Sequence, residues 1–213
     1  HQMAAYCGIT WFDSDAYPAE YRHKLYMGNI HGGCINVDGL ERNGATYKGI
    51  KHDDFLTAND VWFMPVVQKV GPDGCLYVLD WYDRYHCYQD ANADPQGVDR
   101  AKGRLYRVRY KETPRAPKFD LAAETDDQLI ERLASPNVYY REQAQRILAE
   151  RLASGSAAAG TGAKLAAQVA DTQRGFEALV KDILPRATQI LDYIAVHAGH
   201  ALKRWEDRLG TPP

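Results

Sequence analysis

Hydrophobic and polar residues alternate over short runs in the first half of the chain, whereas hydrophobic residues recur every three or four positions in the second half. Short β-branched and aromatic runs separated by Gly, Pro, Asn and Asp are typical of strands joined by turns. The pattern predicts strands over Tyr6–Phe12, Lys24–Asn29, Cys34–Leu40, Thr46–Ile50, Trp62–Val70, Cys75–Asp80 and Arg104–Tyr110. Such strands indicate a sandwich, a barrel or a propeller, and they would fill about two propeller blades of ~40–45 residues each.

The clearest local signal lies in the stretch Gly71–Asp83. Its first four residues, Gly-Pro-Asp-Gly, predict a turn, because proline fixes one φ angle and the last glycine accepts a positive one. The strand that follows ends at two carboxylates flanking two aromatic rings: Asp80, Trp81, Tyr82 and Asp83. Many β-rich proteins build a site in this way. The alternative is a core strand followed by a solvated turn.

The second half of the chain predicts an all-α part. Residues 111–125 form a linker, and Thr125 is a good N-cap for a helix that begins with two acidic residues. A second helix covers about Val138 to Leu152, so residues 126–152 resemble one HEAT-like hairpin, which needs neighbours to bury its faces. Residues 153–163 are a flexible low-complexity linker. Residues 164–213 predict two further helices with apolar stripes, Leu165–Leu184 and Ala187–Leu209.

Composition narrows the class of protein. The chain has 213 residues, of which 45% are hydrophobic and 25% charged, and its net charge of -2 does not favour a nucleic-acid partner. No apolar run reaches the ~18 residues of a membrane span. Three of the four cysteines, Cys7, Cys34 and Cys75, lie in apolar runs and are expected to be buried thiols rather than ligands or bridges. Because the chain starts at His1 with a strand pattern close behind, we expect a piece of a longer protein.

Several motifs, taken together, resemble a known family. They are His1-Gln2-Met3-Ala4-Ala5-Tyr6-Cys7-Gly8, Tyr17-Pro18-Ala19-Glu20-Tyr21-Arg22, Met27-Gly28-Asn29-Ile30-His31-Gly32, Asp54-Phe55-Leu56-Thr57-Ala58-Asn59-Asp60-Val61-Trp62-Phe63, the Gly71–Asp83 stretch and Gly103-Arg104-Leu105-Tyr106-Arg107-Val108. Residues 1–152 are similar to the membrane-bound dehydrogenases of planctomycete–verrucomicrobial type. The resemblance implies that residues 1–110 are a partial β-propeller of glucose/sorbosone dehydrogenase-like type, about two blades, followed by HEAT-like helices.

This resemblance also implies a function. The parent protein would be extracytoplasmic and would oxidise a sugar or another alcohol with a quinone cofactor, PQQ, together with Ca²⁺. It would pass electrons to a c-type cytochrome module, whose haem lies outside this chain. Two blades cannot close a channel, so this chain alone is expected to be inactive. The chain departs from the family at Met64, where an arginine is expected to face an anionic quinone, and residues 153–213 do not match.

Candidate site residues follow from the ends of the strands, which would face a propeller channel. The proposed catalytic base is His31, because an unperturbed imidazole pKa near ~6.5 suits removal of a hydroxyl proton. A histidine that only bonds the turn backbone is the alternative. The predicted substrate- and cofactor-binding residues are Asn29, Asn36, Asn59, Asp60, Trp62, Trp81 and His86, with the rings either stacking on sugars or packing in the core.

The predicted metal ligands are Asp80 and Asp83. Calcium takes 6–8 oxygen ligands, so these two carboxylates would supply only part of a shell. Their alternative role is to cap the turn that follows the strand. At the level of the whole protein, two further possibilities stay open: a propeller that binds carbohydrate or a protein partner without redox chemistry, and a mainly structural segment whose helices mediate assembly.

Overall fold

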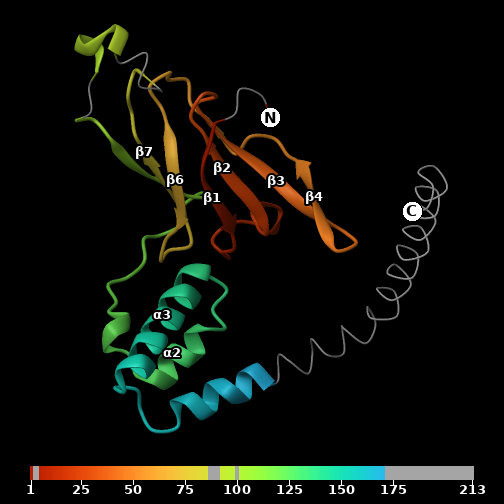
Figure 1. Ribbon diagram of the computed structural model, residues 1–213, viewed down its shortest axis with the longest axis vertical. Helices are drawn as coiled ribbons and strands as arrows, with labels where there is room; N and C mark the ends of the chain where they lie inside the picture. The colour runs from red at the N-terminus through yellow and green to blue at the C-terminus, as the bar shows by residue number, and fades with distance from the viewer. Residues whose placement is uncertain (2–4, 86–91, 99–100, 171–213) are drawn as a thin grey trace, which may run out of the picture. The chain divides into compact units, whose positions relative to one another are not determined.

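The computed structural model describes residue 1 and residues 5–85, 92–98 and 101–170. The chain divides into two compact units, His1–Ala157 and Ala158–Pro213. In the first unit, two antiparallel β-sheets precede the helices (Figure 1). The predicted change from a β-rich part to an α-helical part is therefore confirmed.

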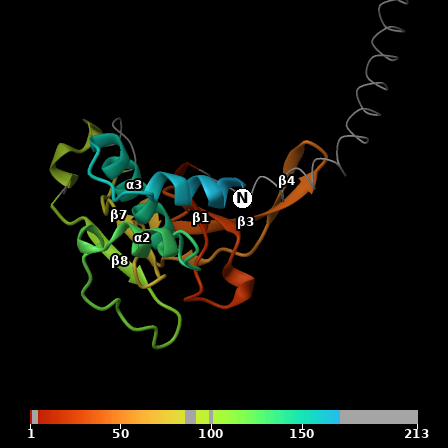
Figure 2. The ribbon, with the colours of Figure 1, turned by 90° about the horizontal axis from the view of Figure 1, so that it is seen from below.

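Sheet A is built from strands that follow one another in chain order. Its antiparallel path runs through β1 (Tyr6–Phe12), β2 (Lys24–Asn29), β3 (Cys34–Asn43) and β4 (Thr46–Lys51), and the two-residue β5 (Leu56–Thr57) also pairs with β3. A short 3-10 helix, η1 (Ala19–Tyr21), lies in the β1–β2 connection. The outer ends of β3 and β4 extend away from the rest of the sheet (Figure 2).

Sheet B contains β6 (Pro65–Val70), β7 (Leu76–Asp80) and β8 (Arg104–Val108), also antiparallel. The predicted turn joins β6 to β7: the Gly74 N–H donates to the Gly71 carbonyl (2.9 Å), and Gly74 has φ 73°. Another 3-10 helix, η2 (Pro95–Gly97), lies between β7 and β8.

Three features of the strand prediction were wrong in detail. The strand predicted to end at Leu40 continues to Asn43, because β4 pairs with it over that length. The strand predicted from Trp62 begins only at Pro65, because Asp60 forms a turn whose carboxylate accepts the Trp62 N–H (3.0 Å). The carbonyl of Asp60 also accepts the Phe63 N–H (3.1 Å). In addition, β5 was missed, since two residues carry no periodic pattern and pair only because β3 lies beside them.

The hydrophobic core lies between the facing sides of the two sheets. Strand β7 shows the alternation: Leu76 and Val78 are buried, whereas Tyr77 and Leu79 point to the other face. The main members of the core are Phe12, Tyr17, Tyr26, Ile35, Val37, Phe63, Val70, Cys75, Leu76 and Val78. At the place where β2 meets β6, the Gly28 N–H donates to the buried side chain of Gln68 (3.2 Å), which ties one sheet to the other.

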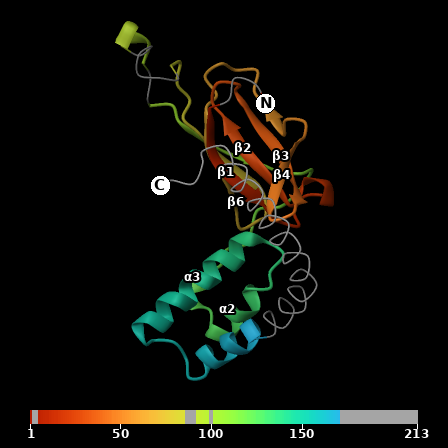
Figure 3. The ribbon, with the colours of Figure 1, turned by 45° about the vertical axis from the view of Figure 1, so that its right-hand side comes forward.

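Two helices form a hairpin after the sheets. A 3-10 turn, η3 (Leu121–Ala123), precedes α2 (Asp126–Arg132), and α3 (Val138–Ser154) lies beside α2 (Figure 3). Thr125 caps α2 as predicted, in a reciprocal capping box with Gln128. Leu129 and Leu148 are buried in the hairpin, and the left-handed Gly155 (φ 71°) ends α3.

The hairpin is bound to the sheets at its Ser135-Pro136-Asn137 turn. The Val138 N–H donates to the Asp13 carbonyl (3.0 Å), and Arg141 forms an ion pair with the Asp13 carboxylate. In the second unit, residues 161–170 are helical, so that helix begins inside the predicted linker of residues 153–163. The remainder of the predicted helical segment lies outside the described residues. No helix in the described ranges has the length and apolar character to cross a membrane.

Candidate functional site

The first candidate site is a small pocket that we call the rim pocket, with a volume of about 250 Å³. It forms where the β2–β3 turn meets the loop after β5, and the Ala58 N–H donates to the Gly33 carbonyl there (2.9 Å). Its lining residues are Ile30, His31, Gly32, Gly33, Ala58, Asn59, Asp60 and Val61. The fold thus brings together three predicted site residues, His31, Asn59 and Asp60, from segments almost thirty positions apart.

Two other predicted residues, Asn29 and Asn36, lie behind this pocket and are buried. The Asn29 side chain accepts the Gly32 N–H (3.0 Å) and donates to the side-chain oxygen Oδ1 of Asn36 (3.0 Å). Asn36 in turn donates to the Asp54 carboxylate (2.6 Å). These bonds fix the turn that carries His31, so in this structure the two amides position the rim pocket from below. Direct contact of Asn29 or Asn36 with a ligand stays a prediction.

A histidine that the sequence did not single out completes this buried polar group. The His1 ring is 95% buried, since its side chain is only 5% exposed, and its Nε2 lies 2.8 Å from the Asp38 carboxylate. Its Nδ1 lies 3.9 Å from the Asp54 carboxylate. The outer face of sheet A therefore carries a connected set of polar side chains that reaches from His1 to the rim pocket.

The predicted metal ligands lie at the end of β7. Asp80 is buried, and its Oδ1 accepts the N–H groups of Met64 (2.8 Å) and Tyr82 (2.9 Å), while its Oδ2 has no hydrogen-bond partner among the described residues. Asp83 accepts the Tyr85 N–H (3.4 Å). Both carboxylates thus hold the backbone of the turn, as the alternative interpretation of the sequence expected.

The aromatic residues beside Asp80 form a surface cluster. Trp62 and Tyr82 pack at 5.5 Å between ring centroids, and the Arg104 guanidinium lies 3.5 Å from the centroid of the Tyr82 ring. Trp81 is half exposed and its backbone N–H donates to the Met64 carbonyl (2.9 Å). His86, the remaining predicted binding residue, lies outside the described residues.

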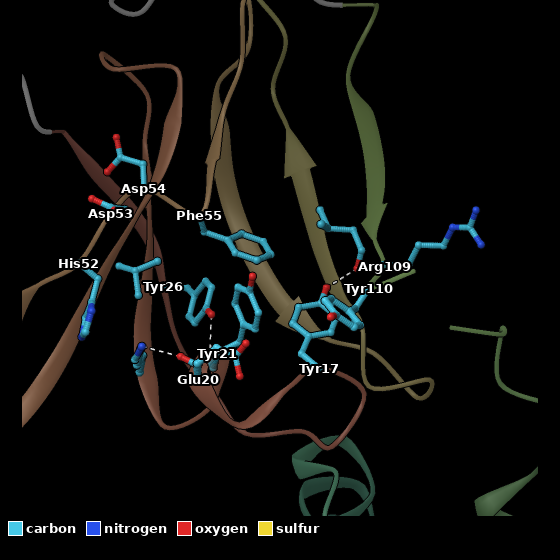
Figure 4. Close-up of a pocket in the computed structure, with 13 residues that line it drawn as sticks. Tyr17, Glu20, Tyr21, Tyr26, His52, Asp53, Asp54, Phe55, Arg109 and Tyr110 are labelled. Atoms are coloured by element: carbon cyan, nitrogen blue, oxygen red, sulfur yellow. Dashed lines mark hydrogen bonds between the residues drawn. The ribbon is translucent and has the colours of Figure 1, made fainter. Parts of the chain in front are cut away.

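A second and larger pocket, which we call the tyrosine pocket, has a volume of about 450 Å³. It forms between the β1–β2 connection, the β4–β5 connection and the end of β8. The residues that line it are Tyr17, Glu20, Tyr21, Lys24, Tyr26, Val37, His52, Asp53, Asp54, Phe55, Val108, Arg109 and Tyr110. Figure 4 shows His52, Asp53 and Asp54 on one side of the rings and Arg109 on the other.

The deepest rings of the tyrosine pocket belong to the core. Tyr17 donates its hydroxyl proton to the Val108 carbonyl and accepts the Leu76 N–H (3.1 Å), and Tyr26 donates to the Tyr21 carbonyl (2.8 Å). Burial raises the pKa of both phenols, so both stay neutral. The sequence held one signal for this pocket, the abundance of tyrosine before residue 111, which local reasoning attributes to strand propensity alone.

Comparison with known proteins assigns the first part of the chain to a family. The family described as "Domain of unknown function (DUF7133)" matches residues 1–112, which is more than half of the chain. The chain belongs to the DUF7133 family. No curated protein and no solved structure matches it. The DUF7133 match covers both sheets, both pockets and the turn after β7, and it ends before the helical hairpin.

Proposed function

We propose that the DUF7133 region forms two neighbouring blades of a β-propeller and that α2 and α3 begin a HEAT-like stack. Both sheets are antiparallel meanders that pack face to face, as blades do. Sheet B keeps a row of apolar side chains on its outer face: Val67, Leu79 and Leu105 pair across the strands and are 37%, 44% and 67% exposed. Such a face favours further packing partners, which additional blades would supply.

The proposed activity is that of an extracytoplasmic dehydrogenase-like protein that oxidises a sugar or another alcohol. The single observation that supports it is the rim pocket, where His31 lies with Asn59 and Asp60. The amide and carboxylate would hold hydroxyl groups of a polyol, and the imidazole would accept the proton of the hydroxyl that reacts. The buried Asn29 would keep the His31 turn in place during that transfer.

The described residues do not fit the predicted cofactors. No lysine or arginine lines the rim pocket, so no permanently charged cation there pairs with the anionic groups of PQQ. Position 64 holds a buried methionine, whose backbone rather than side chain engages Asp80. Among the described residues, no group of three or more His, Cys, Asp or Glu side chains could hold a metal. PQQ, Ca²⁺ and an electron-accepting cytochrome module therefore enter the proposal only as contributions from other parts of a longer protein.

A second candidate function is a platform that binds carbohydrate or a protein partner without turnover. The buried Met64 favours it, because an uncharged side chain cannot pair with the anionic groups of a quinone. Under this reading His31, Asn59 and Asp60 would bind hydroxyl groups only. The two candidates share a ligand class and differ in whether electrons are transferred.

The test is a dye-reduction assay on the protein that carries this chain together with its remaining blades. PQQ and Ca²⁺ are added, and a panel of sugars and alcohols is supplied. The first candidate predicts turnover that requires PQQ and that His31→Ala abolishes. The matched control is His23→Asn, since His23 is exposed and its positive φ (55°) suits asparagine. Glycan binding without dye reduction would support the platform, and the absence of both would reject the two candidates together.

A further inference from the structure

The tyrosine pocket has the chemical make-up of a ligand site rather than of a gap in the core. Tyr17 and Tyr26 are buried, but Tyr21, Phe55 and Tyr110 are only half buried and offer ring surface to the pocket. The hydroxyl groups of Tyr21 and Tyr110 have no hydrogen-bond partner among the described residues, unlike those of the two deeper tyrosines. A volume of about 450 Å³ lies within the usual ~300–1,000 Å³ range of ligand pockets.

The polar rim of this pocket carries both charge signs. The carboxylates of Glu20 and Asp53 have no ion pair or hydrogen-bond partner among the described residues. Lys24 donates to the Glu20 carbonyl (2.5 Å), and Arg109 pairs with Glu112 (2.8 Å) outside the pocket. Groups of both signs line the rim, so it offers both acceptors and donors, and a neutral ligand with many hydroxyl groups can use both.

The spacing of the rings excludes an aromatic cage for an ammonium group. Phe55 lies 5.0 Å from Tyr26, 6.1 Å from Tyr17 and 6.2 Å from Tyr21 between ring centroids, so the rings pack on one another. An aromatic cage needs several ring faces around an open space, which rings packed on one another do not leave. The Lys111 ammonium group already lies 5.2 Å from the centroid of the Tyr110 ring. A continuous aromatic surface bordered by hydroxyls and carboxylates instead suits the flat apolar face of a sugar ring and its hydroxyl edge.

We propose that the tyrosine pocket binds a neutral saccharide. The choice of this ligand class rests on the proposed function. The pocket is distinct from the rim pocket. Lys24, at the first residue of β2, lines the tyrosine pocket, whereas His31 follows the last residue of that strand. The two sets of lining residues come nearest in the chain at Phe55 and Ala58, three residues apart, which at ~3.3 Å per residue is about 10 Å. The tyrosine pocket would therefore retain a saccharide apart from the residues proposed to react.

The test is isothermal titration calorimetry of the full 213-residue chain with four neutral probes, cellotetraose, maltotetraose, xylotetraose and chitotetraose. We expect at least one of them to bind. Tyr21→Ala and Tyr110→Ala should each weaken that binding about tenfold or more, as expected for loss of an aromatic anchor. Tyr21→Phe keeps the ring and should weaken it less than Tyr21→Ala does. Circular dichroism of each variant verifies that it folds.

Two controls make the outcome decisive. Tyr47→Ala removes an equally large ring that is 64% exposed on β4, and it should leave binding unchanged. His23→Asn, at an exposed residue that lines neither pocket, should also leave it unchanged. Loss of binding in His31→Ala but not in the tyrosine variants would place the saccharide in the rim pocket and overturn the inference. The titration measures binding to this chain and the dye assay measures electron transfer in a longer protein, so the failure of one is distinguishable from the failure of the other. The inference is overturned if no neutral probe binds, if choline or glucuronate binds more tightly than the neutral probes, or if both tyrosine-to-alanine variants bind like the unaltered chain.

Discussion

The side-chain amide of Asn137 donates to the carbonyl oxygen of Gly71 at 3.1 Å, which joins the helical hairpin to the β6–β7 turn. The same amide donates to the Pro72 carbonyl (3.2 Å), and its oxygen accepts the Tyr139 N–H (3.0 Å) as the cap of α3. One buried asparagine thus begins a helix and fixes it to a turn more than sixty residues away. This explains why the hairpin belongs to the same compact unit as the sheets.

Replacement of Asn137 should separate its role as the cap of α3 from its hydrogen bonds to the β6–β7 turn. Asn137→Asp keeps the capping oxygen but turns a second oxygen toward two carbonyl groups, so we expect it to lower the free energy of unfolding by about 1–3 kcal/mol. Urea unfolding followed by circular dichroism measures the change. Thr125→Ala is the control, because Thr125 caps only α2 and should cost about 1 kcal/mol. A smaller loss in Asn137→Asp than in Thr125→Ala would contradict the assigned role.

Gly28 should tolerate no side chain. A Cβ atom at this position would overlap the Pro65 carbonyl oxygen and approach the Gln68 amide (2.5 Å), so Gly28→Ala must push β2 away from β6. We expect a loss of more than about 2 kcal/mol, similar to the higher costs of overpacking. Gly49→Ala is the matched control. Its Cβ would meet only the Asp38 carboxylate at 3.7 Å, and thermal unfolding should show little change or a small gain.

The two faces of β7 should respond differently to the same substitution. Leu76→Ala removes a fully buried side chain and should cost about 2–5 kcal/mol. Leu79→Ala, three residues along on the outer face, should cost less than about 1 kcal/mol in this chain. Chemical denaturation of both variants gives the comparison. In a longer protein with further blades, the free-energy cost of Leu79→Ala should rise toward that of Leu76→Ala. If Leu79→Ala costs the same in the longer protein as in this chain, that result would count against the proposed blade packing.

Stability should fall at alkaline pH because of Tyr17. Burial raises the pKa of this phenol above its ordinary value of 10.0, so above pH 10 the unfolded chain releases a proton that the folded chain retains. Proton release on unfolding makes the free energy of unfolding decrease as the pH rises through this range, whereas the full contribution of Tyr17 is present below pH 10. Tyr26 adds to the same trend, since burial raises its pKa too.

Tyr17→Phe should change this profile in a defined way. It should lower stability near neutral pH by about 1–3 kcal/mol, because the Leu76 N–H and the Val108 carbonyl lose their partner. It should also flatten the decline above pH 10. Urea unfolding at several pH values between neutral and alkaline measures both effects, with the exposed Tyr47→Phe as the control. An unaltered alkaline slope in Tyr17→Phe would assign the decline to other groups.

Local chemistry explains the parts of the fold that could be predicted. The bounds of β1 and β2 were confirmed as predicted, and β4, β7 and β8 agree to within one or two residues at either end. The Gly71–Gly74 turn and the Thr125 cap depend on the conformational limits of proline and glycine and on one side-chain oxygen, all of which lie within a few residues. The missed strand β5 depends on β3 lying alongside, and the start of β6 depends on the turn that Asp60 forms before it.

The sequence by itself determined the order of strands and helices, the turns and the presence of His31, Asn59 and Asp60 at strand ends. Only the tertiary structure decided which polar groups are buried and which face a pocket. Asn29 and Asn36 are buried and bonded to each other because β2 pairs with β3, and Asp54 accepts the second hydrogen bond of Asn36. The rings from Tyr17 to Tyr110 line one pocket because the two sheets meet there. Burial depends on partners distant in the chain, so no local pattern contains it.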